Sequence, residues 1–92
     1  MQPEQHPQYR HADNVSWRRV GDQVLIIQIP TSAYFSLNGV GALVWEKLGA
    51  GDDAVRVREA VCREYDAEPA AVERDVAKLI GKLTKAQLLL AR

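Results

Sequence analysis

Hydrophobic and polar residues alternate in the first half of the chain, and apolar residues repeat at helical spacing in the second half. The alternation across residues 15–19 predicts a strand. Residues 24–29 are β-branched and almost continuously apolar, which predicts a second strand covered on both faces. A turn at Gly21-Asp22 joins the two runs into a hairpin. Residues 33–37 form a third predicted strand, because alternation resumes there after a break at Pro30.

Three predicted helices follow these strands. The first covers residues 40–48, with Asn38 as its candidate cap and Gly49 at its end. Asp52 or Asp53 is expected to cap the second helix, whose apolar stripe is Val57, Val61 and Tyr65. Pro69 suits the first position of the third and longest helix. The apolar positions of that helix are Val72, Val76, Leu79, Ile80 and Leu83.

Three strands followed by three helices predict an α+β domain with a three-stranded antiparallel sheet. Three short helices beside so small a sheet suit a winged helix-turn-helix-like arrangement. The domain is expected to span residues 13–92, and near its end Leu88, Leu89 and Leu90 close the chain against the core. Residues 1–12 are polar, with prolines at positions 3 and 7, and are expected to form a flexible tail.

Size and charge narrow the classes of function. A length of 92 residues suits one domain with a modest core. Twelve basic residues balance twelve acidic ones, which argues against a nucleic-acid partner because phosphate binding normally requires an excess of Lys and Arg. The sequence contains neither an apolar signal segment nor a stretch long enough to span a membrane, so a cytoplasmic protein is expected.

The residues offer little catalytic chemistry. A single cysteine, Cys62, makes neither an internal disulfide nor a Cys-rich metal site. His6 and His11 both fall in the predicted tail, without a carboxylate or cysteine at ligand spacing, so no metal and no cofactor are expected. The predicted domain contains no other histidine for a catalytic triad, and the paired glycines near residues 40 and 50 lack the context of a phosphate loop. We therefore expect a protein that is not an enzyme.

Binding is the better supported class. A three-stranded sheet has two edges whose unpaired backbone groups invite another strand. The strand at residues 33–37 contains neither Lys nor Pro to block such pairing, which leaves it open to β-augmentation by a guest peptide. A covering helix, or a homodimer in which two such strands pair, are the alternatives. On the third helix, Asp75, Lys78 and Lys82 flank the apolar stripe, where they are able to meet a guest's polar groups.

Residues 34–48 carry a more specific pattern. They read Tyr-Phe-Ser-Leu-Asn-Gly-Val-Gly-Ala-Leu-Val-Trp-Glu-Lys-Leu, and this stretch resembles the PqqD-like family. That family shows an aromatic strand, then Leu-Asn, a Gly-Ala pair, and an aliphatic residue with Trp followed by Leu. The upstream Gly-Asp hairpin and the Asp75-Val76 pair fit the same pattern, so the resemblance covers residues 14–90.

The resemblance implies a recognition element for the precursors of ribosomally synthesised, post-translationally modified peptides. Such domains are similar to a winged helix-turn-helix, and they bind the leader of the precursor as a strand added to the third strand, in a cleft shared with the third helix. Carried over to this chain, and extended along the helix by its geometry, the expected contacts are Ala33, Tyr34, Phe35, Ser36, Leu37, Val72, Asp75, Val76, Leu79 and Lys82.

The resemblance also implies a free-standing adaptor that serves a separate modifying enzyme. We favour delivery of the precursor to a leader peptidase, as in lasso-peptide biosynthesis. The alternatives are a chaperone that presents the precursor to a radical enzyme in pyrroloquinoline quinone biosynthesis, and a winged-helix DNA-binding regulator. A proline at Phe35 is predicted to abolish leader binding if the backbone pairing is real.

Overall fold

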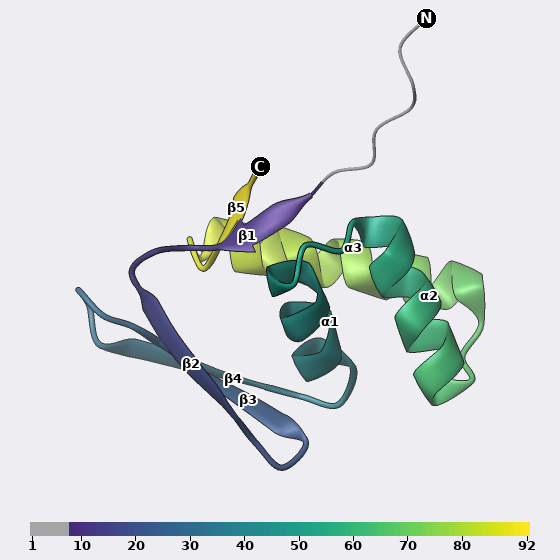
Figure 1. Cartoon of the computed structure of the whole chain (residues 1–92), viewed down its shortest axis with the longest axis horizontal. Helices are drawn as coiled ribbons and strands as arrows, with labels where there is room; N and C mark the ends of the chain where they lie inside the picture. Colours follow the sequence, from purple (N-terminus) through teal and green to yellow (C-terminus); the bar gives the residue numbers. More distant parts are fainter. Residues whose placement is uncertain (1–7) are drawn as a thin grey trace, which may run out of the picture.

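The three strands of residues 15–38 and the three helices of residues 40–85 occupy separate parts of the molecule, and two short terminal strands lie beside the helices (Figure 1). The structure is a computed structural model that describes residues 8–92. Its elements, in chain order, are β1 (Tyr9–His11), β2 (Val15–Val20), β3 (Gln23–Gln28), β4 (Ala33–Asn38), α1 (Val40–Gly49), α2 (Ala54–Tyr65), α3 (Pro69–Lys85) and β5 (Leu89–Ala91). The predicted α+β class and the order of three strands followed by three helices are confirmed.

The central sheet is antiparallel, with the strand order β2-β3-β4. Gly21 adopts a φ of 63° in the turn between β2 and β3, a left-handed conformation that glycine tolerates without strain. The prediction that residues 24–29 are covered on both faces is wrong. Val24 and Ile26 are fully buried against the helices, but Ile27 is 47% exposed on the outer face. Only one face is covered, because all three helices lie on the same side of this sheet (Figure 1).

The predicted N-terminal residues are found at two of the three helices. Asp53 caps α2, and its carboxylate accepts a hydrogen bond of 2.9 Å from the backbone N–H of Arg56. Pro69 occupies the first turn of α3, as predicted. The prediction that Asn38 caps α1 is wrong, because β4 extends through that residue. Gly39, at a φ of 49°, provides the sharp change of direction from β4 into α1.

A second, two-stranded sheet joins the two ends of the described chain. β1 pairs antiparallel with β5, and the N–H of Ala12 donates to the carbonyl of Leu88 at 3.0 Å. The predicted flexible tail at residues 1–12 is therefore wrong for residues 8–12, where the Gln8 carbonyl accepts a hydrogen bond from the N–H of Arg92 and Ala12 is buried. The rest of that prediction, with His6, falls on residues 1–7, which lie outside the described residues. Pattern reasoning missed β1 because three residues are too few to show a period.

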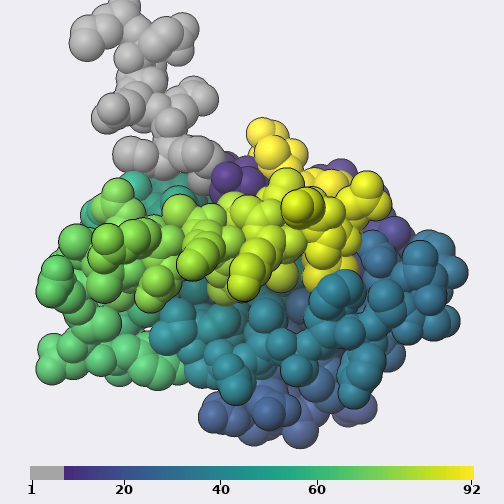
Figure 2. All heavy atoms as spheres, turned by 180° about the vertical axis from the view of Figure 1, so that it is seen from behind, coloured from purple at the N-terminus to yellow at the C-terminus, as the bar shows by residue number. Residues whose placement is uncertain are grey.

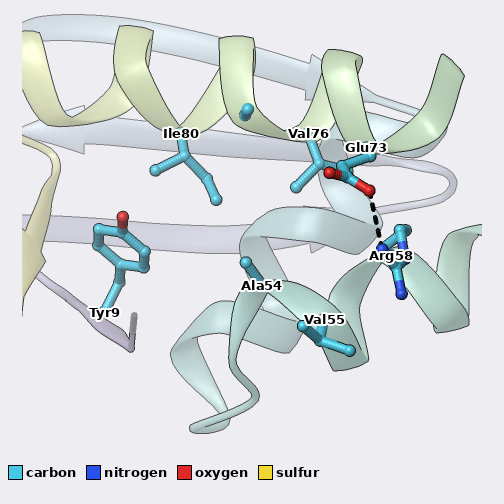
Figure 3. A pocket seen from close by; sticks show the side chains of 8 residues that line it. Tyr9, Ala54, Val55, Arg58, Glu73, Val76 and Ile80 are labelled. Atoms are coloured by element: carbon cyan, nitrogen blue, oxygen red, sulfur yellow. Dashed lines mark hydrogen bonds and ion pairs between the residues drawn. The ribbon is translucent and has the colours of Figure 1, made fainter. Parts of the chain in front are cut away.

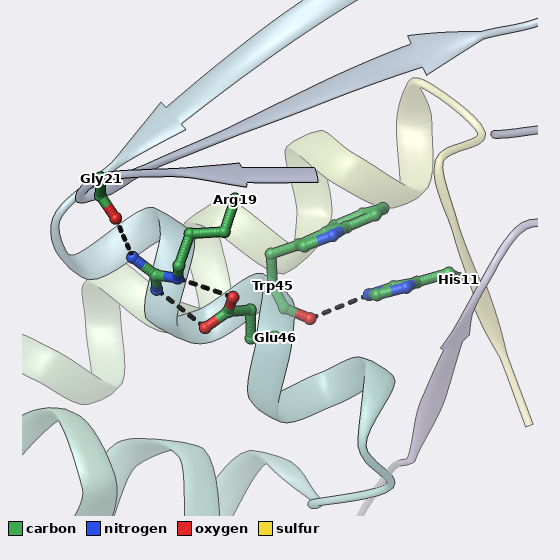
Figure 4. A network of polar contacts seen from close by, with 5 residues as sticks. All are labelled: His11, Arg19, Gly21, Trp45 and Glu46. Carbon is green, nitrogen blue, oxygen red and sulfur yellow. Dashed lines mark hydrogen bonds and ion pairs between the residues drawn. The ribbon is translucent and has the colours of Figure 1, made fainter. Parts of the chain in front are cut away.

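His11 fastens β1 to the core. Its imidazole stacks on the fully buried ring of Trp45 at a centroid distance of 3.7 Å, and its Nε2–H donates to the Trp45 carbonyl at 2.9 Å (Figure 4). Nearby, the guanidinium of Arg19 forms two hydrogen bonds of 2.7 Å with the carboxylate of Glu46, and this pairing lowers the pKa of Glu46. These contacts hold β1 and the β2–β3 hairpin against α1, so the sheet is fixed relative to the helices.

Candidate functional site

One edge of β4 is free of any strand among residues 8–92. The other edge pairs with β3, and the N–H of Gly39 continues this ladder by donating to the carbonyl of Asp22 at 3.1 Å. Because backbone bonding alternates along an antiparallel pair, the N–H and C=O groups of Phe35 and Leu37 point toward β3. Those of Tyr34, Ser36 and Asn38 point toward the free edge. A row of unpaired donors and acceptors therefore faces solvent.

A groove runs between this edge and α3, which lie on the same face of the molecule in Figure 2, α3 in yellow-green above the blue-teal of β4. Its first part, the narrow hollow, has a volume of about 320 Å³. Apolar side chains from both elements and from the segment after α3 dominate its wall. The lining residues are Phe35, Ser36, Leu37, Leu79, Lys82, Leu83, Ala86 and Leu88.

The second part of the groove, the wide hollow, lies at the Asn38 end of β4 and has a volume of about 740 Å³. Its wall is more polar and includes the turn into α1. The lining residues are Asp22, Ser36, Leu37, Asn38, Gly39, Val40, Gly41, Tyr65, Asp75 and Leu79. Ser36, Leu37 and Leu79 line both hollows, so the two form one continuous β4–α3 groove.

Charges are distributed unevenly along the β4–α3 groove. Lys82 is the one charged residue that lines the narrow hollow. Asp22 and Asp75 are the charged residues that line the wide hollow. The groove is therefore positive at one end and negative at the other, with an apolar stretch formed by Leu37 and Leu79 between them.

The structure brings most of the predicted contact residues to this groove. Phe35, Ser36, Leu37, Leu79 and Lys82 line the narrow hollow, and Asp75 lines the wide one. Ala33 begins β4 and is half-buried, while the side chain of Tyr34, 69% exposed, points to the outer face of the sheet.

Two predicted contacts lie elsewhere. Val72 and Val76 are 5% and 3% exposed and belong to the hydrophobic core. Neither lines the β4–α3 groove. Val76 differs from Leu79 by about 60° around the helix axis, and this rotation separates it from the groove wall. Val72 lies nearly in line with Leu79 but about two turns earlier, before Asp75, the first residue of α3 that lines the groove.

Other groove residues were missed at the level of the sequence. Tyr65 was assigned to the core stripe of its helix, but it is 45% exposed and lines the wide hollow. Gly41 lines the wide hollow, and the absence of a side chain there leaves space between Leu37 and Leu79. An added Cβ would lie 3.4 Å from Leu37 Cβ and 3.7 Å from Leu79 Cδ2 and would fill part of this space. The Gly at position 41, so early in a helix, was the available signal, because glycine inside a helix often marks a close approach.

Two further hollows lie outside the groove. One, of about 320 Å³, lies between α2 and α3 under Tyr9, and the ion pair between Arg58 and Glu73 (2.8 Å) spans its rim (Figure 3). The other, on the outer face of the central sheet, includes Leu25, Ile27 and Tyr34. Neither shares a lining residue with the β4–α3 groove.

The described part of the chain contains neither a candidate metal site nor a candidate membrane-spanning helix. Across residues 8–92, no three His, Cys, Asp or Glu side chains gather in a way that could hold a metal ion. Within the same range, no helix combines the length and apolar character needed to cross a bilayer.

Comparison with known proteins gives three findings. Residues 23–89 match the family model described as coenzyme PQQ synthesis protein D (PqqD). The fold is similar to that of TbiB1 in complex with the TbiA(beta) leader peptide, with 30% identity, a TM-score of 0.82, and coverage of 87% of this chain and 93% of that one. It is also similar to lasso peptide synthetase B1 complexed with the leader peptide, with a TM-score of 0.83 and coverage of 90% and 98%. That second likeness, at 24% identity, concerns the fold alone. No curated protein matched the chain.

Proposed function

This chain belongs to the family of coenzyme PQQ synthesis protein D, and on that premise we propose that it is a peptide-binding adaptor. Its ligand is the leader segment of a ribosomally made precursor peptide. The leader adds a strand to the free edge of β4 and places alternate side chains in the β4–α3 groove. Chemistry on the precursor is then carried out by a separate enzyme.

The observation that carries this proposal is the coincidence of an open strand edge with a continuous groove. The free N–H and C=O groups of Tyr34 and Ser36 supply pairing that depends little on the guest's sequence. The apolar wall of the narrow hollow supplies selectivity. Burying one leucine-sized side chain there would contribute about 1.5–3 kcal/mol. The strand edge alone would pair with peptides of many sequences, whereas the edge together with the narrow hollow favours peptides whose side chains fit the hollow.

We infer that the contacts of the leader are six of the residues predicted from the sequence, together with the backbone of Tyr34. Ser36, Leu37, Asp75, Leu79, Lys82 and Phe35 line the groove, while Val72 and Val76 support α3 from within the core. Ala33 marks the end of the available edge.

The favoured partner enzyme is a leader peptidase of a lasso-peptide pathway. Support comes from the neighbour TbiB1, which was solved with a leader peptide and shares 30% identity over most of both chains. The family description, which names coenzyme PQQ synthesis, favours a radical enzyme as the alternative. Binding to the adaptor raises the effective concentration of the precursor at whichever enzyme it serves. Reconstitution with each purified enzyme and its precursor separates the two: only the true partner is accelerated by the adaptor.

Amide hydrogen exchange tests the binding proposal directly. The chain is compared alone and with the leader of the precursor encoded beside its gene, with a scrambled leader as control. We expect new protection at Tyr34 and Ser36 with the true leader, and unchanged, already high protection at Phe35 and Leu37. Protection at none of these amides, or equal protection by the scrambled peptide, would contradict strand addition at β4.

A further inference from the structure

The β4–α3 groove carries negative charge at one end and positive charge at the other. We propose that Asp22 and Asp75 at one end and Lys82 at the other select leaders by the order of their charges. The preferred guest carries a basic side chain toward its N-terminus and an acidic side chain toward its C-terminus. This inference rests on the proposed function, since it requires a strand in the groove.

The direction follows from the strand and helix that form the walls. β4 runs from the narrow hollow, near Ala86, toward the wide hollow at Asn38. α3 runs the opposite way, from Asp75 to Lys82. The three strands of the central sheet are antiparallel, and antiparallel pairing is the slightly more stable kind. A guest that continues this pattern enters at the wide, negative hollow and leaves past the narrow, positive one.

The spacing of the charges fits alternate positions of a strand. Asp75 and Lys82 are seven residues apart on one helix, which is about 10 Å along its axis. A strand covers this distance in about three residues. Only every second side chain of the guest faces α3, so the complementary charges are expected two or four positions apart. At a spacing of four, the one α3-facing side chain between the charges reaches Leu37 and Leu79, which line both hollows, and it is expected to be apolar.

Like charges sharpen this preference. A guest with the reverse order would place an acidic side chain beside Asp22 and Asp75 and a basic one beside Lys82. Each exposed pair contributes little by itself. The forward guest is attracted at both ends of the groove, however, whereas the reversed guest is repelled at both ends. We therefore expect the Kd of the reversed guest to be about tenfold higher than that of the forward guest. Because the pairs are exposed, 0.5 M NaCl should reduce this ratio.

Selection from a random library tests the inference without knowledge of the natural leader. The probe is an mRNA-display library of 12-residue random peptides, selected on the immobilised full chain. A recovered peptide and its charge-reversed version are then synthesised and their affinities measured by fluorescence anisotropy. The same pair is measured on the double variant Asp75→Lys/Lys82→Glu, and on Arg56→Glu. Arg56 is exposed on α2 and lines neither hollow, so Arg56→Glu tests a change of net charge away from the groove, whereas the double variant moves charge within the groove and leaves net charge unchanged.

The outcomes are distinct. The inference predicts recovered peptides with a basic residue before an acidic one, and about tenfold weaker binding of the reversed version. In the double variant the reversed version should bind better, by less than tenfold because Asp22 remains in the wide hollow, and Arg56→Glu should leave the ratio unchanged. Peptides that bind at the β4 edge without this order, or an order that the double variant leaves intact, would overturn it while the proposed function stands. Recovery of no groove-binding peptide at all would overturn the proposed function, and the inference with it.

Discussion

Replacement of Ser36 by proline is the sharpest test of strand addition. The N–H of Ser36 points to the free edge of β4, whereas the N–H of Phe35 belongs to the ladder with β3. A proline at Phe35, suggested by the sequence alone, would break the central sheet itself and report on folding. At Ser36, which is exposed, proline removes only a donor that the guest would use, because proline is tolerated on edge strands.

The magnitude follows from one lost hydrogen bond. A backbone hydrogen bond contributes about 1 kcal/mol net, and a guest carbonyl left unpaired in the groove costs about 1–2 kcal/mol more. The sum, about 2–3 kcal/mol, corresponds to a Kd about 30- to 160-fold weaker. Ser36→Ala keeps the N–H and loses only the hydroxyl, so it should bind within about threefold of the natural chain.

Fluorescence anisotropy with a labelled leader measures both variants, and circular dichroism with thermal unfolding checks that each is folded. A folded Ser36→Pro that binds as tightly as Ser36→Ala would refute backbone pairing at this edge. A second route leaves the protein unchanged: single N-methyl groups placed along the leader should weaken binding at every second position, as alternate pairing requires. Uniform tolerance of N-methylation would lead to the same rejection.

Three further predictions concern the scaffold and the groove wall. Gly49→Ala should destabilise the fold by about 1–3 kcal/mol in urea unfolding, because the added Cβ collides with the His11 imidazole. Gly81→Ala, with open space around the position, should stabilise the fold by about 0.5–1 kcal/mol. Equal changes in stability for the two variants would contradict the close contact between position 49 and His11. Burial lowers the pKa of His11 below its ordinary 6.5, so the unfolded chain binds the proton more tightly and stability should fall as pH drops from 7 to 5.5. In His11→Phe the free energy of unfolding should no longer fall over this pH range. If it falls as in the natural chain, His11 is not the cause. Leu79→Ala should weaken leader binding about tenfold with little change in stability, whereas Val72→Ala should cost about 2 kcal/mol of stability and leave the affinity of the folded chain unchanged. The reverse assignment would move Val72 into the groove.

Predictions from periodicity succeeded where a run was long enough to repeat. α3 shows this well: its apolar positions and Pro69 together predicted both its existence and its start. The β2–β3 hairpin was predicted from its alternation and a Gly-Asp turn, which are local features. The failures arise where an element depends on a partner far away in the sequence. β1 has three residues, and its partner β5 lies about 80 positions away, so neither strand shows a pattern without the other.

The sequence by itself determined the class of the fold, the identity of the edge strand and the family to which the chain belongs. These depend on spacing within single elements and on a contiguous motif at residues 34–48. Only the tertiary structure decided which face of β4 and of α3 meets a guest. Helix rotation buries Val76 and leaves Leu79 in the groove, and ladder parity turns the N–H of Ser36 outward and that of Phe35 inward. Both depend on how elements pack against one another, which no pattern within one element contains.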